Sequence, residues 1–317
     1  MMRFKKSMRL AAVAGLTLMT AAVLSAQYRV TGKFGRKQIN GRNLIVHVTV
    51  AAPVGVPAGP IADRELINRG AAPLGSSPFV ALGPVWEDSA GGGVGADNLV
   101  QSYNDMGGGG AIPDPTSGGG AAYTHAQTTW SAVSTSRFAF KDSGATTNRC
   151  PSLVEECDGG QLTDTYHDVG WCNLGVLHPI FGGILGVTWF EWDAATNKMI
   201  EADVCLNGDG SVPWSITGTS DIDVDTVMLH ELGHVATIGH SRTRKAVMYA
   251  SYLGVRRELH GDDVNAISTL YPGDDGGVDP PGSCVVPDGL PLGSSCTNDG
   301  DCCSGKCKGK PRGKVCK

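Results

Sequence analysis

The chain has 317 residues, enough for one sizeable domain with smaller additions. Its hydrophobic and charged fractions, 41% and 18%, suit a globular protein rather than a disordered one. The net charge of −5 gives no reason to expect a nucleic-acid partner.

The first residues have the layout of a secretory signal peptide. Four basic residues between Arg3 and Arg9 precede an apolar run, Leu10 to Leu24, and the small residues Ser25-Ala26 follow it. The run is shorter than the roughly 20 residues that a transmembrane helix needs, and no later segment is apolar enough to span a membrane. We therefore expect a cleaved signal peptide at 1–26 and a secreted protein, extracellular or periplasmic, without stable membrane insertion. An even count of ten cysteines fits such an oxidising compartment.

The elements that follow predict a mixed α/β domain. Residues 27–78 are an N-terminal extension or a propeptide, which the sequence leaves open, and contain a strand at Asn43–Val50. The domain itself spans 79–273. Alternation and helical spacing predict its elements: strands at Leu99–Tyr103, Arg137–Lys141, Ile184–Trp192 and Lys198–Leu206, and a helix at 121–135. The last two strands form a hairpin, and Asp225 is the predicted N-cap of a helix running through Val235.

The segment His230-Glu231-Leu232-Gly233-His234 has the spacing of a metal site. On a helix, residues four apart lie on one face, so two imidazoles reach one ion while Glu231 projects beside it. A catalytic zinc needs three protein ligands and an open position for water. In this interpretation Glu231 takes a proton from zinc-bound water as that water attacks a peptide carbonyl, and passes the proton to the leaving amine.

The third ligand has two candidates. His240 comes six residues after His234, and the flanking Gly239 and Ser241 favour the turn that this ligand requires. Glu258 is the acidic ligand that a gluzincin-type zinc hydrolase would use. A further alternative is a non-catalytic binding protein, against which the intact Glu231 argues.

Residues 230–241, HELGHVATIGHS, resemble the zinc motif of the metzincins and specifically of bacterial matrixin-like peptidases. Residues 246–249, AVMY, resemble their Met-turn, with Met248 beneath the zinc site. The resemblance implies an α+β metzincin-type zinc protease domain, with a twisted mixed sheet and an active-site helix. It implies a zinc endopeptidase with His230, His234 and His240 as ligands and Glu231 as the base. The family has Gly where this chain has Thr237, so we expect a differently built turn, one that uses Gly239.

The same resemblance carries expectations about substrate and latency. Protein or peptide substrates in extended conformation would pair with the sheet edge near Glu201–Leu206. The family's propeptide latch places a Cys thiolate on the zinc, and no Cys precedes Cys150 here, so this chain cannot use it. Structural calcium is a further expectation of the resemblance. Asp221, Asp223 and Asp225 are its candidates, although helix capping and a solvated loop explain them better.

The ten cysteines fall into two groups that favour disulfides over metal sites, because none shows a paired CxxC spacing. The central group is Cys150, Cys157, Cys172 and Cys205. Residues 274–283 form a linker by composition. The tail at 284–317 holds the second group: Cys284, Cys296, Cys302, Cys303, Cys307 and Cys316.

This tail resembles the knottins, or inhibitor cystine knots, through its adjacent Cys302-Cys303 between widely spaced cysteines. Six cysteines allow fifteen pairings, and the resemblance implies first with fourth, second with fifth and third with sixth. The tail is also basic, with six Lys and Arg residues from Lys306 to Lys317. It would bind an acidic surface or a glycan, or serve as a protease-resistant end.

Overall fold

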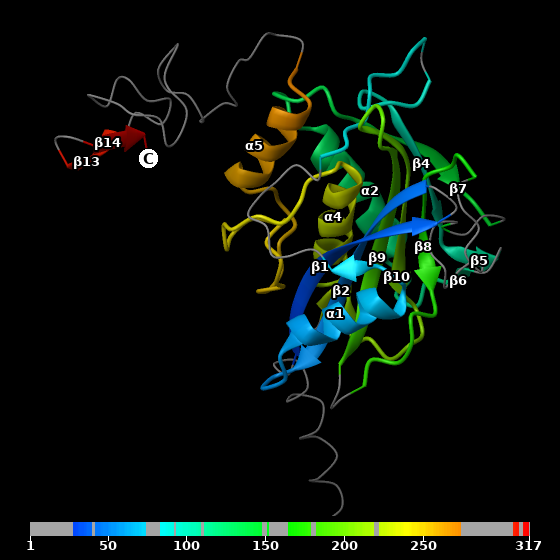
Figure 1. The fold of residues 1–317 in the computed structure, drawn as a ribbon. Helices are drawn as coiled ribbons and strands as arrows, with labels where there is room; N and C mark the ends of the chain where they lie inside the picture. Colours follow the sequence, from blue (N-terminus) through cyan, green and yellow to red (C-terminus); the bar gives the residue numbers. More distant parts are fainter. Residues whose placement is uncertain are drawn as a thin grey trace, which may run out of the picture.

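The computed structural model of the chain (Figure 1) describes residues 28–39, 42–73, 83–91, 93–108, 111–147, 151, 164–178, 182–218, 222–273, 307–310 and 313–316. The expected signal peptide and linker lie outside the described residues, as do Cys150, Cys157 and four tail cysteines from Cys284 to Cys303. No described helix is both long and apolar enough to cross a membrane.

A ten-stranded mixed sheet organises the molecule, with the order β3-β1-β2-β9-β10-β8-β4-β7 and with β5 and β6 at its side. Strands β10, β8, β4 and β7 run parallel, whereas β9, β2, β1 and β3 continue the sheet in antiparallel pairs. The strands are β1 (Tyr28–Ile39), β2 (Arg42–Pro53), β3 (Ala72–Pro73), β4 (Leu99–Asn104), β5 (Met106–Gly108), β6 (Ala111–Pro113), β7 (Phe140–Ala145), β8 (Asp168–Cys172), β9 (Gly183–Asp193) and β10 (Lys198–Asn207). This mixed sheet with its helices is consistent with the expected α+β metzincin fold.

Four helices in the described residues pack on this sheet or beside it: α1 (Ala58–Asn68), α2 (Gly119–Ser131), α4 (Val224–Val235) and α5 (Gly261–Leu270). Helices α2 and α4 lie against each other, and the Trp130 indole of α2 donates a 2.9 Å hydrogen bond to Leu229 O of α4. Short strands β11 (Trp214–Ser215) and β12 (Ile222–Asp223) lead into α4. In the tail, β13 (Cys307–Lys310) pairs antiparallel with β14 (Gly313–Cys316), which puts Cys307 opposite Cys316 in the register.

Strand β2 faces two apolar cores, because its side chains alternate between the two faces of the sheet. Leu44, Val46, Val48 and Val50 join α1 in one core, whereas Ile45 joins the core that holds α2 and α4. By the same alternation, polar side chains at the neighbouring odd positions face α4. The disulfide Cys172–Cys205 links β8 to β10 in the α1 core.

The predicted strands in β2, β4, β9 and β10 and the predicted helix in α2 are confirmed. Two local predictions were wrong. The N-cap of α4 is Asp223, whose carboxylate accepts from Thr226 N at 2.9 Å, while Asp225 lies in the first turn. The strand predicted at Arg137–Lys141 begins only at Phe140, because the Arg137 amide bonds instead to Tyr271 O.

The prediction that a substrate would pair along Glu201–Leu206 was also wrong. That segment belongs to β10, which lies inside the sheet between β9 and β8 with both edges bonded. The other edge of β9 carries β2, which comes from the segment predicted to be an extension or propeptide. The sheet position of β10 depends on pairing with distant strands, which local alternation does not encode.

Candidate metal centre

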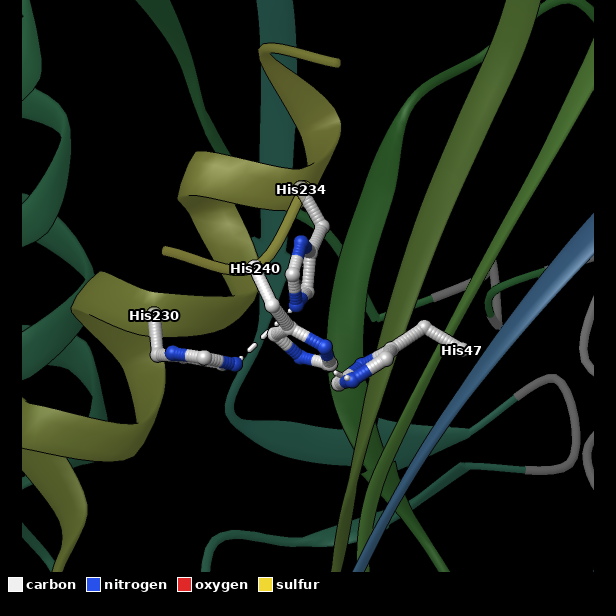
Figure 2. A group of neighbouring side chains, drawn as sticks. All are labelled: His47, His230, His234 and His240. Carbon is white, nitrogen blue, oxygen red and sulfur yellow. Dashed lines mark hydrogen bonds between the residues drawn. The ribbon is translucent and has the colours of Figure 1, made fainter. Parts of the chain in front are cut away.

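Helix α4 presents His230 and His234 on one face, one turn apart (Figure 2). His230 Nδ1 donates to Val247 O at 2.8 Å and His234 Nδ1 donates to Ile238 O at 2.7 Å. A carbonyl oxygen can only accept, so each Nδ1 carries a proton, and the singly protonated tautomer with its proton there has its lone pair on Nε2. The two Nε2 atoms nevertheless lie 3.0 Å apart. Two lone pairs at this distance repel each other unless a cation lies between them.

His240 reaches the same point through a tight turn after α4. Thr237 makes this turn with a left-handed backbone, φ 63°, and its amide bonds to His234 O at 2.8 Å. The expectation that Gly239 would provide the turn was therefore wrong. A left-handed L-residue costs about 1–2 kcal/mol. The Thr237 hydroxyl offsets part of this cost with a buried 2.9 Å hydrogen bond to the hydroxyl of Tyr271.

A fourth histidine, His47 of β2, completes the cluster and was missed by the sequence reasoning. Its Nε2 lies 3.1 Å from His240 Nε2, and the ligand atoms of all four histidines lie within 4.8 Å of one another. Figure 2 shows His47 reaching the cluster from the side opposite His230. The sequence did hold a signal for His47: it is a lone histidine inside the apolar strand NLIVHVTV. A polar side chain on a buried face of a strand needs a polar partner on the element that packs against that face.

This donor set fits zinc. Burial, reinforced by neighbouring histidines, lowers the pKa of His47, His234 and His240 well below the ordinary value. These rings are therefore neutral near pH 7, which is the form that binds zinc. Tetrahedral zinc with Zn–N bonds of 2.0–2.1 Å requires nitrogens roughly 3.3 Å apart. Among the described residues, the four histidines form the cluster that approaches this geometry.

Glu231 lies beside the cluster and is fully buried. Its Oε1 accepts from the Thr49 hydroxyl at 2.7 Å, and its Oε2 accepts from the Thr188 hydroxyl at 2.5 Å. His47 Nδ1 donates to the same Oε2 at 3.0 Å. Both oxygens of the carboxylate are thus held next to the histidines by β2 and β9.

Met248, the residue expected in a Met-turn, packs beneath α4. It is fully buried, and a Cβ on Gly233 would collide with its Sδ. The Asp263 carboxylate holds this turn by accepting from Val247 N at 2.8 Å and from Met248 N at 3.0 Å. Since Val247 O in turn accepts from His230, Asp263 orients a cluster histidine through one peptide group.

The structure does not bring Glu258 to the cluster. Its exposed side chain lines a separate hollow with His125, Thr129 and Val264. The acids considered for calcium are paired with other groups: Asp223 with Arg257, and Asp225 with His125 and Arg257. Asp221 lies outside the described residues. A calcium site therefore stays a prediction.

Comparison with known proteins gives a family for this region. Residues 115–272 match the family model described as Matrixin. Karilysin from Tannerella forsythia is 47% identical over 101 residues, which cover 31% of this chain and 20% of that protein. Metalloendoproteinase 2-MMP from Arabidopsis thaliana is 30% identical over 107 residues, 32% of this chain and 28% of its own length. Metalloendoproteinase 1 from Glycine max is 35% identical over 92 residues, 28% of this chain and 29% of its own.

These matches show that residues 115–272 are similar to the matrixin domain, which supports a matrixin-like metzincin. Two of these relatives are metalloendoproteinases by name. The chain spans less than a third of the length of each of these three relatives. The N-terminal strands β1 and β2 lie outside the region that the family model covers.

Proposed function

We propose that the chain is a secreted zinc-dependent endopeptidase in which His230, His234 and His240 hold the zinc and Glu231 is the general base. One observation carries the proposal: the Nε2 lone pairs of the histidines converge on one point, and the buried carboxylate of Glu231, from the same helix as His230 and His234, lies beside it. Zinc supplies a Lewis acid that polarises the scissile carbonyl and favours ionisation of water.

The chain's own residues then move the proton and hold the carboxylate. Glu231 accepts a proton from the attacking water and delivers it to the leaving amine. The Thr188 hydroxyl donates to Glu231 Oε2 and fixes which way the carboxylate faces. The carbonyls of Val247 and Ile238 keep two imidazoles in the tautomer that leaves Nε2 free.

The substrate of this proposal is an extended peptide segment that pairs with β9 rather than with β10. Gly186 and Thr188 of β9 lie beside Glu231, and an added Cβ on Gly186 would stand 3.6 Å from its Oε1. A strand bonded to this edge therefore brings its backbone to the base. Strand β2 illustrates the geometry, because it pairs here and lays Thr49 against Glu231.

Glu231→Gln tests the chemistry, since it keeps the shape of the side chain and removes the base. We expect zinc content to be unchanged and hydrolysis of a denatured protein to fall by about 10²–10⁴-fold. A zinc chelator should abolish the wild-type activity. Near wild-type turnover in the Glu231→Gln protein contradicts the proposed role of the base. Absence of any chelator-sensitive hydrolysis, also after removal of residues 28–53, supports a binding protein instead.

The choice of third ligand has its own paired test. His240→Ala should release zinc, whereas Glu258→Ala should keep both zinc and activity, because Glu258 lines a separate exposed hollow. The affinity loss in His240→Ala should exceed the roughly 10–100-fold typical of removing a partner of a ligand. The reverse pattern of zinc loss would assign the site to a gluzincin-type hydrolase.

Secretion and the cysteine-rich tail complete the proposal. Residues 1–26 serve as a signal peptide, and residues 284–317 form a small disulfide-bonded module after the linker at 274–283. The six tail cysteines should all be oxidised, with no pair shared with the central group. Mass mapping under non-reducing conditions measures this, and a free thiol in the tail or a mixed pair rejects an independent module.

A further inference from the structure

The N-terminal hairpin, β1 and β2 at residues 28–53, covers the histidine cluster from two sides. Strand β2 pairs with β9 in a register that sets His47 opposite Thr188 and Thr49 opposite Gly186. Strand β1 bonds to the segment after the Met-turn: Gly32 N donates to Ala250 O at 2.8 Å, and Tyr252 N donates to Val30 O at 3.2 Å. The backbone edges on both sides of the cluster are thus already paired with this hairpin.

His47 has the geometry of a ligand and not of a neighbouring core side chain. It is fully buried, and its Nδ1 lies 3.0 Å from Glu231 Oε2, which can only accept when ionised. The proton of the neutral ring is therefore on Nδ1, and the lone pair on Nε2 points into the cluster, 3.1 Å from His240 Nε2. A carboxylate–histidine pair of this kind is the arrangement in which metal-binding imidazoles are held.

The hairpin packs closely over the histidine cluster. The Phe34 ring, opposite His47 in the register, lies 4.7–4.8 Å from the ring centres of His47, His234 and His240. A Cβ on Gly32 would collide with His47 and would stand 2.9 Å from His240 Nε2. Only glycine therefore leaves room at this position of β1 for the two rings. Three positions of the hairpin are thus fitted to the site: His47 contacts the other histidines, Thr49 bonds to Glu231, and Gly32 leaves room for the rings.

We propose that His47 is a fourth protein ligand of the metal and that the N-terminal hairpin closes the active site of the intact chain. This rests on the proposed peptidase function. A catalytic zinc needs an open position, and a fourth imidazole occupies it. The hairpin also binds both oxygens of Glu231 and the β9 edge, so the base and the substrate-pairing edge are occupied together. Hydrolysis then requires the hairpin to leave.

Counting the imidazoles on zinc tests the ligand without reference to activity. Zinc K-edge X-ray absorption of the intact zinc-loaded protein, with residues 28–53 verified by mass, should show four histidines. His47→Ala should show three histidines and one oxygen, and its zinc affinity should fall at least about tenfold. Lys33→Ala is the control, because Lys33 lies on the same hairpin and pairs with Asp63. Three histidines in the wild-type protein overturn the assignment, and this result needs no variant.

Cutting the chain tests the closure. The turn after β2 is accessible: Val54 is 57% exposed, and a side chain on Gly55 would meet nothing within 4 Å. A recognition sequence for a site-specific protease inserted between Gly55 and Val56 allows the hairpin to be separated. Hydrolysis of a denatured protein should appear only in samples that have lost residues 28–53. The rate per molecule should rise at least about tenfold on release, since access is limited by the fraction of open molecules.

Each outcome decides one part of the proposal. A sample that retains the hairpin and hydrolyses protein as fast as a hairpin-free sample overturns the closure. A sample that has lost the hairpin, shows three histidines on zinc and still does not hydrolyse protein rejects the peptidase function. In that case the His47 assignment stands on the imidazole count. Glu231→Gln in the hairpin-free sample separates peptidase activity of this site from a contaminating protease.

Discussion

Asp263 at the start of α5 is the residue whose replacement most directly tests how the turn beneath the site is held. Its carboxylate is 1% exposed and accepts three backbone N–H groups. They are Val247 N at 2.8 Å, Met248 N at 3.0 Å and His260 N at 2.9 Å. Asp263→Asn keeps the shape of the side chain and replaces one acceptor oxygen by an NH2 donor. At least one buried N–H then faces another donor.

The cost follows from the type of bond lost. A buried N–H left without an acceptor costs about 1–3 kcal/mol, and the remaining bonds lose the strengthening that a charged acceptor gives. One effect opposes this loss: burial raises the pKa of Asp263, so the neutral amide no longer carries the desolvation cost of the carboxylate. We expect a net destabilisation of roughly 2–3 kcal/mol. For a domain of this size that corresponds to a fall in Tm of about 4–12 °C.

The same substitution should also weaken zinc binding. The Val247–Met248 peptide donates its N–H, on Met248, to Asp263 and accepts from His230 Nδ1 through its carbonyl oxygen, on Val247, so a shift of this peptide misorients an imidazole. We expect zinc affinity to fall by about tenfold, at the lower end of the effect of removing a ligand's partner.

Calorimetry and chelator competition measure these two effects. Asp193→Asn is the control, because Asp193, the last residue of β9, also accepts a backbone N–H but in an exposed bond. It should change stability by less than about 0.5 kcal/mol. If Asp263→Asn is as mild as this control, the carboxylate does not hold the turn.

Three further predictions concern other parts of the fold. Gly233→Ala should destabilise the protein by about 1–3 kcal/mol in urea unfolding, although alanine favours helices, because its Cβ would meet Met248 and Trp130; a gain in stability contradicts this packing. Thr237→Gly should be about 1 kcal/mol more stable than Thr237→Ala, because both lose the bond to Tyr271 but only glycine relieves the positive φ; equal stabilities would argue against strain. Burial lowers the pKa of His167 to about 4, so the unfolded chain, with a pKa of about 6.5, takes up this proton first as the pH falls. Stability is therefore lost between about pH 6.5 and pH 4, by roughly 3 kcal/mol, and His167→Gln should flatten this decline when both unfolding curves are compared.

The features that the sequence predicted correctly are those with a local signature. Two histidines four residues apart on a helix share a face whatever surrounds them, and the α4 motif needed no tertiary information. The alternation in residues 184–206 likewise predicted the β9–β10 hairpin. The local predictions that failed were small displacements, such as the N-cap at Asp223 instead of Asp225. At Thr237 the preference for glycine in left-handed backbone misled the prediction, because the threonine takes up this conformation together with a buried hydrogen bond to Tyr271.

The position of a strand within the sheet has no such local signature. The pattern of β10 is that of a buried strand and would look the same at an edge covered by other elements. Its true neighbours are β9 and β8, and β8 begins 30 residues before β10 does. The edge that we propose for substrate pairing is therefore that of β9 and not of β10, because β10 lies inside the sheet.

His47 lies 184 residues from Glu231 in the sequence, and its role still left a trace in β2. The period of a strand puts Ile45, His47 and Thr49 on one face, so two of three successive side chains on a buried face are polar. A buried polar group without a partner costs free energy, so two of them predict a polar partner on the element packed against that face. Helix α4 carries the buried Glu231, and its carboxylate bonds to both side chains. Polar positions on one face of an apolar strand, taken together with a metal motif elsewhere in the chain, therefore predict this contact without any knowledge of the sheet order.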